Sequence, residues 1–397
     1  MRRRQSVRSV ASDYDWGQST RENYASSTPG VHTAPFASTR QAMDDEWHGP
    51  GYTLDRQAVQ DAIVKAVLDE TEDAPREAGS RPWIILSGGV MGVGKTRSLR
   101  WLSSMGIADL SNTVLTDADR IKWRLPEIAD YVRRDADSAA TRTHEESAYI
   151  VEIIRQEAIL SGRSVVIDGS MRHAEWWAEW IDRQRATGGA AEGYRFALWH
   201  FVAPPSKIYE RAARRSVQTG RHVPREVIEK ALVEVPHSVE RLLPLMDVSA
   251  TISTADDRCP RLVELKADDS VRREERAAAA AIEHTESHRH PPPTLSGNQL
   301  EWTPFAELFG ARGGFDRSQR RRRRGGGLGG GGLGGSGLGN LNAGIAGGGG
   351  LNVVPPEARP AAQTTYEIAA RAGGRIAAMA ATVAGRGRRL ARIAFFG

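Results

Sequence analysis

The chain has 397 residues, a formal net charge of +5 and a single cysteine. This length allows two or three domains, and the lone Cys259 excludes an intrachain disulfide and a cysteine-rich metal site. No apolar run approaches the roughly 18 residues of a membrane span, and no apolar stretch near the start is typical of a secretory signal. We therefore expect a cytoplasmic protein, although the basic segment Met1 to Ser9 keeps targeting to an organelle open.

Composition divides the chain into four parts. Residues 1–50 are polar and lack periodicity, so we expect a disordered basic arm. Residues 51–265 have ordinary globular composition, enough for one α/β domain. Residues 266–363 are predicted to be a low-complexity linker, in which the run Arg320–Arg324 precedes a Gly/Leu tract. Residues 364–397 are rich in Ala and Arg, with the spacing of a short helix that has a narrow apolar stripe.

Helix-like and strand-like segments alternate along the globular part. Helical spacing is found over residues 54–70, 97–104, 145–161, 173–186, 206–217 and 225–233. Apolar or β-branched runs of strand length cover residues 83–86, 113–115, 164–167, 195–202 and 250–252. Strands that alternate with helices in this way indicate a parallel sheet flanked by helices, so the predicted fold class is α/β.

A glycine-rich segment follows the first predicted strand: Gly89-Val90-Met91-Gly92-Val93-Gly94-Lys95-Thr96. It satisfies G-x-x-x-x-G-K-[ST] and stands between a strand and a helix, as a phosphate-binding loop requires. In such a loop, backbone N–H groups cradle phosphate oxygens, the lysine reaches the β- and γ-phosphates, and the threonine hydroxyl holds Mg²⁺. The sequence therefore predicts a site for ATP and Mg²⁺ in a P-loop NTPase-type fold.

Acidic residues follow the next two predicted strands. Asp117 and Asp119 would stand at the sheet edge where ligands bind in open α/β folds. One carboxylate there can accept the proton of an attacking hydroxyl. Asp119 is the favoured candidate, whereas Asp117 fits equally well as the N-cap of a helix. Asp168 ends its strand and is a candidate ligand of Mg²⁺, with a turn aspartate as the alternative.

Arginines cluster on a later predicted helix and the turn that follows it: Arg211, Arg214, Arg215 and Arg221. A guanidinium offers a rigid fork of donors that can neutralise a transferring phosphoryl group. A basic helix is also an ordinary solvated face, and the same two interpretations hold for Glu152 on its charged helix. Trp176, Trp177 and Trp180 fit either stacking on a substrate or core packing.

Taken in order, these motifs resemble the zeta toxin family of P-loop kinases over residues 80–255. The matching residues are Gly88-Gly89, Asp117-x-Asp119 with Lys122 and Pro126, Glu152 with Gly162, Asp168-Gly169-Ser170 with Arg172, and the Gly220-Arg221-x-x-Pro224 turn. The chain departs from the family where Asp168 replaces a common Glu and Lys122 a frequent Arg. Arg214 also competes with Arg215 for one assignment.

The resemblance implies roles for these residues. Catalysis would involve Asp119 as the base, with Lys95, Arg215 and Arg221 on the γ-phosphate. Substrate binding would involve Asp117, Glu152, Ser170 and Arg172, and Thr96 and Asp168 would hold Mg²⁺.

The implied activity is ATP-dependent transfer of the γ-phosphate to a hydroxyl of a small molecule. UDP-N-acetylglucosamine, the acceptor of bacterial family members, is one candidate. Two other interpretations stay open. A P-loop kinase could act on nucleotides or on nucleic-acid ends recruited through Arg320–Arg324. Alternatively, the chain is a non-enzymatic ATP-binding switch or scaffold. The oligomeric state is left open by the sequence.

Overall fold

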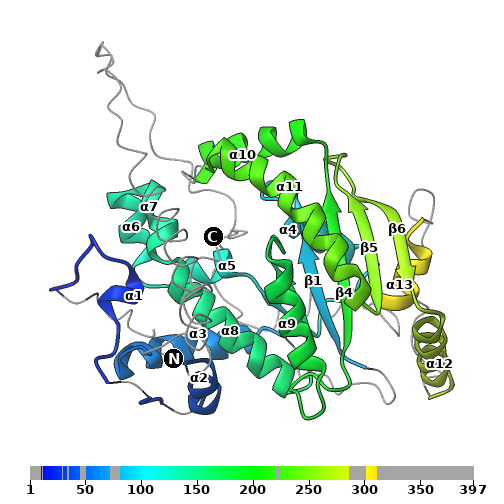
Figure 1. Cartoon of the computed structure of the whole chain (residues 1–397), viewed down its shortest axis with the longest axis horizontal. Coiled ribbons are helices and arrows are strands. Elements are labelled where there is room, and N and C mark those ends of the chain that lie inside the picture. The colour runs from blue at the N-terminus through cyan, green and yellow to red at the C-terminus, as the bar shows by residue number, and fades with distance from the viewer. Residues whose placement is uncertain are drawn as a thin grey trace, which may run out of the picture. The chain divides into compact units, whose positions relative to one another are not determined.

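A six-stranded sheet with the order β2-β3-β1-β4-β5-β6 organises the molecule (Figure 1). Strands β1 to β5 are parallel, and β6 runs antiparallel to β5. The strands are β1 Trp83–Gly88, β2 Thr113–Thr116, β3 Ser164–Asp168, β4 Arg195–Val202, β5 Val248–Ser253 and β6 Arg261–Ala267. The computed structural model describes residues 10, 12–28, 30–33, 35–44, 51–71, 81–219, 223–285 and 301–310.

Helices flank the sheet, which confirms the predicted α/β class. The predicted strands between residues 83 and 252 are all present. In the described ranges the helices are α1 Thr20–Asn23, α2 Ala37–Met43, α3 Leu54–Leu68, α4 Lys95–Ser104, α5 Ala118–Lys122, α6 Ile128–Arg134, α7 Ala136–Arg142, α8 His144–Leu160, α9 Ala174–Arg185, α10 Pro205–Thr219, α11 Arg225–Leu242, α12 Asp269–Thr285 and α13 Thr303–Phe309. The sequence analysis did not predict α1, α2, α5, α6, α7, α13 or β6.

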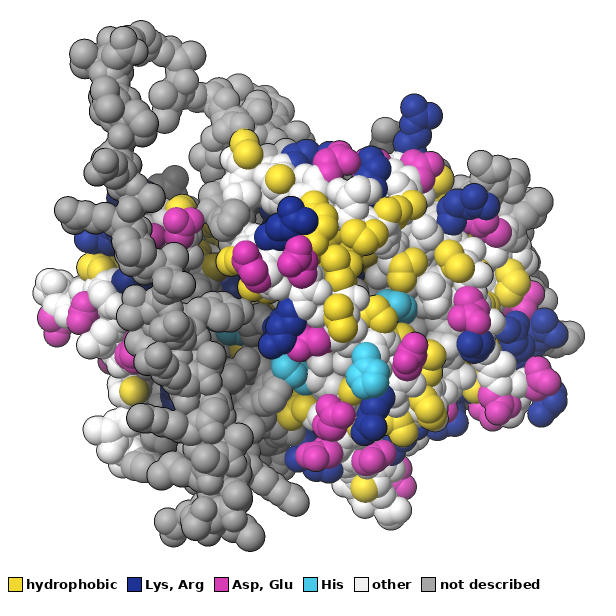
Figure 2. All heavy atoms as spheres, turned by 45° about the horizontal axis from the view of Figure 1, so that its top comes forward, with side chains coloured by type: hydrophobic (Ala, Val, Ile, Leu, Met, Phe, Trp, Pro, Cys, Tyr) yellow, Lys and Arg dark blue, Asp and Glu magenta, His cyan; other side chains and the backbone are white. Residues whose placement is uncertain are grey.

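Within the described residues, no helix is both long and apolar enough to cross a bilayer. On the face drawn in Figure 2, Lys and Arg side chains alternate with Asp and Glu side chains rather than forming a field of one sign.

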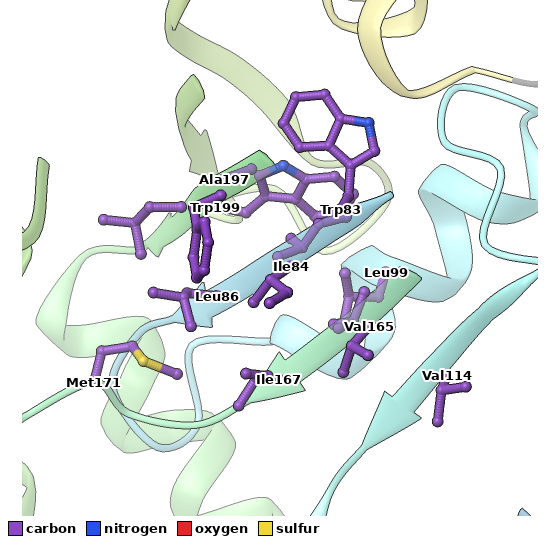
Figure 3. Close-up of a cluster of buried hydrophobic side chains, with 14 of the residues drawn as sticks. Trp83, Ile84, Leu86, Leu99, Val114, Val165, Ile167, Met171, Ala197 and Trp199 are labelled. Atoms are coloured by element: carbon purple, nitrogen blue, oxygen red, sulfur yellow. The ribbon is translucent and has the colours of Figure 1, made fainter. Parts of the chain in front are cut away.

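Alternate residues of β4 face opposite sides of the sheet, as the pleat requires. On one side, the ring of Phe196 lies 6.4 Å from that of Trp180 in α9. On the other side, Trp199 lies 5.1 Å from Phe305 of α13. Strand β1 runs between these layers and is buried along its whole length, as expected for a central parallel strand. Figure 3 shows its Ile84 among the apolar side chains of the neighbouring strands.

The folded unit extends past residue 265, where the sequence analysis ended the domain. Strand β6 adds an edge to the sheet. Beyond it, the fully buried Phe305 of α13 packs on Trp199 of β4, and the fully buried Trp302, the N-cap of α13, packs on Trp101 of α4. Helix α13 has seven residues, which is too short for helical periodicity to be visible in the sequence. Its composition alone therefore assigned it to the linker. The arginine run Arg320–Arg324 and residues 364–397 lie outside the described residues.

Part of residues 1–50, which we expected to be a disordered arm, packs on the domain. The described residues there include α1 and α2. The buried Arg40 of α2 pairs with Asp61 of α3 at 2.6 Å, and the Tyr14 hydroxyl lies 2.7 Å from the Tyr131 hydroxyl of α6. Glu127 accepts hydrogen bonds from the Arg56 guanidinium of α3, at 2.8 and 2.9 Å. The Tyr24 hydroxyl donates to Glu127 at 2.7 Å. Apolar residues of the segment, among them Phe36 and Met43, also lie in the hydrophobic core, but they are too scattered in the sequence to form a periodic stripe.

We predict that Phe305→Ala lowers the free energy of unfolding by about 3–5 kcal/mol, because a fully buried aromatic side chain is replaced by a cavity. Denaturant unfolding of the full chain measures the change. Val233→Ala, at a position 74% exposed, is the control and should shift stability by no more than about 0.5 kcal/mol. Equal stability of the Phe305 variant and the wild type would exclude α13 from the folded unit.

Candidate active site

Strand β1 ends in a loop whose glycines adopt conformations that side chains avoid. Gly92 has φ 84° and Gly94 has φ 104°. A Cβ on Gly92 would lie only 3.0 Å from the Ile208 carbonyl oxygen. Gly94 is also the N-cap of α4, which begins at Lys95, so the unpaired N–H groups of that helix face the loop. Residues 89–96 therefore have a backbone suited to an anion.

Helix α10 holds this loop through the buried end of Arg211. Its Nη1 donates to the Val93 carbonyl at 2.9 Å, and its Nη2 donates to the Thr254 carbonyl at 2.6 Å. The same guanidinium pairs with Asp257. Arg211 is therefore a positioning residue for the loop. The sequence analysis noted Arg211 within the cluster, but nothing in the sequence distinguished it from its neighbours.

The register of β1 and β3 brings Asp168 beside the loop, since Asp168 pairs with Ser87. The Thr96 hydroxyl donates to Asp168 Oδ2 at 3.3 Å, and Lys95 Nζ lies 3.8 Å from Asp168 Oδ1. Lys95 also donates to the Gly89 carbonyl at 3.0 Å. Oδ1 of Asp168 is buried and accepts no hydrogen bond from the described residues. A hydroxyl beside a carboxylate with an unused oxygen suits Mg²⁺, which takes oxygen ligands.

Carboxylates gather at this edge of the sheet. Burial, with the charges of Asp117 and Asp119, raises the pKa of Asp168 to about 6 against the opposing effects of Lys95 and Thr96. Burial and the neighbouring Asp119 likewise raise the pKa of Asp117. Such a cluster favours a cation. Within the described residues, no group of three or more His, Cys, Asp or Glu could hold a metal, so Mg²⁺ would take its other ligands from phosphate and water.

The two aspartates at α5 occupy different environments. Asp117 is the N-cap of α5, accepting hydrogen bonds from the backbone N–H groups of Asp119 at 2.9 Å and Arg120 at 3.3 Å. The Asp119 side chain is 34% exposed and lies 3.2 Å from Lys122 Nζ and 3.2 Å from Arg215 Nη2. Asp117 thus has the geometry of a cap, whereas the Asp119 carboxylate is accessible and faces α10.

The structure distinguishes the two neighbouring arginines of α10. Arg215 reaches Asp119 across the site, whereas Arg214 lies 3.8 Å from Glu210 of its own helix. Both side chains are about half exposed. Arg221 and its neighbours Gly220 and His222 lie outside the described residues.

Glu152 lies inside the helical layer and away from solvent. It is 2% exposed on α8, and its carboxylate lies 3.8 Å from Arg155 of the next turn. The Arg155 guanidinium stands 4.9 Å from the ring of Trp180. Because Trp177 and Trp180 are buried, their geometry is that of core packing.

The loop after β3 carries Ser170 and Arg172 on either side of Met171. Met171 has φ 58°, which is rare for a residue with a side chain, and its side chain is 1% exposed. The Arg172 carbonyl accepts a hydrogen bond from Ser238 of α11 at 2.7 Å. The buried side chain of Met171 and the hydrogen bond from Ser238 together fix the loop next to Asp168. Neither feature has a sequence pattern that could have revealed it.

Residues 65–258, just under half of the chain, match the zeta toxin family model, and this match confirms the resemblance drawn from the motifs. No curated protein matches the chain.

Two groups of solved structures are similar to it. One comes from a study of the PezAT chromosomal toxin–antitoxin system of Streptococcus pneumoniae, with 17% identity over 54% of this chain and 83% of that chain and a TM-score of 0.45. Another is the AvrRxo1-ORF1:-ORF2 complex with ATP, with 14% identity over 74% of this chain and 96% of that chain and a TM-score of 0.43. The resemblance to the zeta toxin family rests on the family model and the motifs, and these structures carry no part of it.

We predict that Asp168→Asn stabilises the metal-free protein at neutral pH. The pKa of Asp168 is about 6 in the folded protein against 3.8 for an unperturbed Asp. Its contribution to stability is therefore full below about pH 4 and is lost as the pH rises past 6. Asparagine carries no charge to bury. The variant should match the wild type at pH 4 and exceed it by about 2–3 kcal/mol at pH 8.

Denaturant unfolding in EDTA from pH 4 to 8 measures this difference. Asp182→Asn, at an exposed position on α9, is the control and should show no such trend. A variant less stable than the wild type at pH 8 would contradict the prediction.

Proposed function

We propose that the domain is an ATP-dependent kinase that transfers the γ-phosphate to a hydroxyl group of a small molecule. One observation carries the proposal: the loop 89–96, the Thr96–Asp168 pair and the Asp119–Arg215 pair meet at one edge of the sheet. An ATP-binding scaffold has no need of an accessible carboxylate beyond those that would hold the metal. The arrangement therefore favours catalysis over a switch.

In this proposal ATP binds along residues 89–96. The backbone N–H groups of the loop and the Lys95 ammonium contact the β- and γ-phosphates. Thr96 and Asp168 hold Mg²⁺, which when bound neutralises phosphate charge. The buried Asp168 Oδ1, which accepts no hydrogen bond from a described residue, supports this assignment.

Asp119 accepts the proton of the acceptor hydroxyl. The hydroxyl oxygen forms a bond to the γ-phosphorus as the bond from that phosphorus to the β,γ-bridging oxygen breaks, and ADP leaves. Lys95 and Arg215 neutralise the charge on the transferring group. Lys122, at 3.2 Å from Asp119, holds the carboxylate in position. Arg221 joins this set only through the family resemblance.

The acceptor we favour is a small molecule, and a UDP-amino sugar such as UDP-N-acetylglucosamine is one candidate. Asp117, Glu152, Ser170 and Arg172 are assigned to substrate binding by the same resemblance. Nucleic-acid ends are the second candidate. That alternative rests on Arg320–Arg324, outside the described residues, and the face shown in Figure 2 carries charges of both signs instead of a basic surface.

We predict that Lys95→Ala and Asp119→Asn each reduce phosphate transfer by at least about 10²-fold, but that only Lys95→Ala weakens ATP binding. Lys95 contacts ATP in the ground state, whereas Asp119 acts on the acceptor. Transfer from γ-labelled ATP into UDP-sugars, nucleotides and nucleic-acid ends measures the first effect, and calorimetry with ATP measures the second. Full turnover in the Asp119 variant would remove that residue from the role of base.

We predict further that Arg215→Ala lowers the kcat of transfer by about 10²-fold, whereas Arg214→Ala changes it less than two-fold. The two residues are adjacent, equally exposed and of the same chemistry, so they form a matched pair. Equal effects of the two substitutions would show that the orientation of Arg215 toward Asp119 does not contribute to catalysis. Circular dichroism of both variants confirms that α10 is intact.

A further inference from the structure

Thr254, which directly follows β5, is buried against the glycine loop. The residue is 4% exposed. Its backbone N–H donates to the Val202 carbonyl at 2.8 Å, so the end of β4 fixes its place. A Cβ on Gly94 would lie 3.8 Å from both the Cβ and the Oγ1 of Thr254. The threonine therefore packs directly on the backbone of the loop.

The Thr254 hydroxyl, the Arg211 guanidinium and the Val93 carbonyl form a closed triangle of hydrogen bonds. A carbonyl only accepts and a guanidinium only donates, so the direction of each bond is fixed. The hydroxyl donates to the Val93 carbonyl and accepts from Arg211 Nη1 at 3.2 Å. The same Nη1 donates to the Val93 carbonyl at 2.9 Å. The Val202 carbonyl, at 3.3 Å, is a more distant acceptor for the hydroxyl. Two side chains from outside the loop thus hold one carbonyl of the loop.

The Val93 carbonyl sets the direction of a backbone N–H group in the loop. The peptide between Val93 and Gly94 is planar and trans, so the Gly94 N–H points opposite to that carbonyl. No turn or loop hydrogen bond among the described residues uses this N–H. Gly94 has φ 104°, and glycine reaches other backbone conformations at little cost. Without a contact from outside the loop, this peptide could therefore turn over.

We propose that Thr254 is a positioning residue for phosphate binding: together with Arg211 it holds the Val93 carbonyl away from the ligand and keeps the Gly94 N–H directed toward it. A peptide turned over would present a carbonyl oxygen, the negative end of its dipole, to the phosphate. The guanidinium does not suffice by itself, because it also pairs with Asp257. The inference rests on the proposed function, in which this loop binds the phosphates of ATP, and it adds a residue that contacts no phosphate itself.

The test measures binding of ATP with Mg²⁺, and of inorganic triphosphate with Mg²⁺, to the full chain by calorimetry. Thr254→Val keeps the shape of the side chain and removes the hydroxyl, so both ligands should bind about 10-fold more weakly. Thr254→Ser restores the hydroxyl and should bind both within about two-fold of the wild type. Thr143→Val is the matched control, because the fully buried Thr143 also donates to a backbone carbonyl, that of Ala139 at 2.8 Å. It should bind both ligands as the wild type does.

The outcomes separate this inference from the proposed function. Unchanged affinity of Thr254→Val overturns the positioning role and leaves the kinase intact, as does a loss that Thr143→Val shares or that Thr254→Ser fails to restore. A loss for ATP but not for triphosphate also overturns it, since the threonine would then act on the nucleoside.

A wild type that does not bind ATP would contradict the proposed function. If either ligand fails to bind, hydrogen exchange of the ligand-free chain decides the positioning role. Faster exchange over residues 89–98 in Thr254→Val, but not in Thr254→Ser or Thr143→Val, supports it, because the loop and the first turn of α4 would then open more often. Equal exchange in all the variants and the wild type overturns it.

Discussion

The pairing of β1 with β3 is the constraint on which the site depends. Their register sets Asp168 opposite Ser87, so the strand that carries the carboxylate ends where the glycine loop begins. Both strands are central and largely buried, and a shift of one residue would turn every side chain to the other face. The sheet therefore fixes the distance between Asp168 and the Lys95–Thr96 pair before any ligand is bound.

Helix α5 depends on more distant parts of the chain. Five residues are too few for a helix to be stable alone. Asp117 caps its start, and Glu70, which follows α3, pairs with Arg120 of α5 and with Arg124 just beyond it. Glu127, the N-cap of α6, follows within the next five residues. Glu127 is held by Arg56 and by the Tyr24 hydroxyl. The N-terminal segment thus contributes to placing the carboxylate of Asp119, although it lies far from the glycine loop in sequence.

Sequence patterns predicted the features of the molecule that depend only on residues close together in the chain. The glycine loop, the strand-end carboxylates and the alternation of strands and helices each follow from neighbouring residues. Other features depend on contacts between distant segments. The rotation of α10 decides that Arg215 rather than Arg214 faces Asp119, and α13 belongs to the fold through aromatic contacts too few to form a pattern. Glu152 was placed on a charged helix face, yet it is buried beside Arg155.

The ion pair between Arg215 and Asp119 is weak enough for Arg215 to leave it and bind phosphate instead. Both side chains are partly exposed, and an ion pair of this kind contributes about 0–1 kcal/mol. A guanidinium binds phosphate more strongly, through parallel charge-assisted hydrogen bonds. In the proposed reaction Arg215 would leave Asp119 for the γ-phosphate at little cost, and this move would free the carboxylate to accept the proton. Arrival of ATP would then prepare the base, so that transfer to a hydroxyl follows binding.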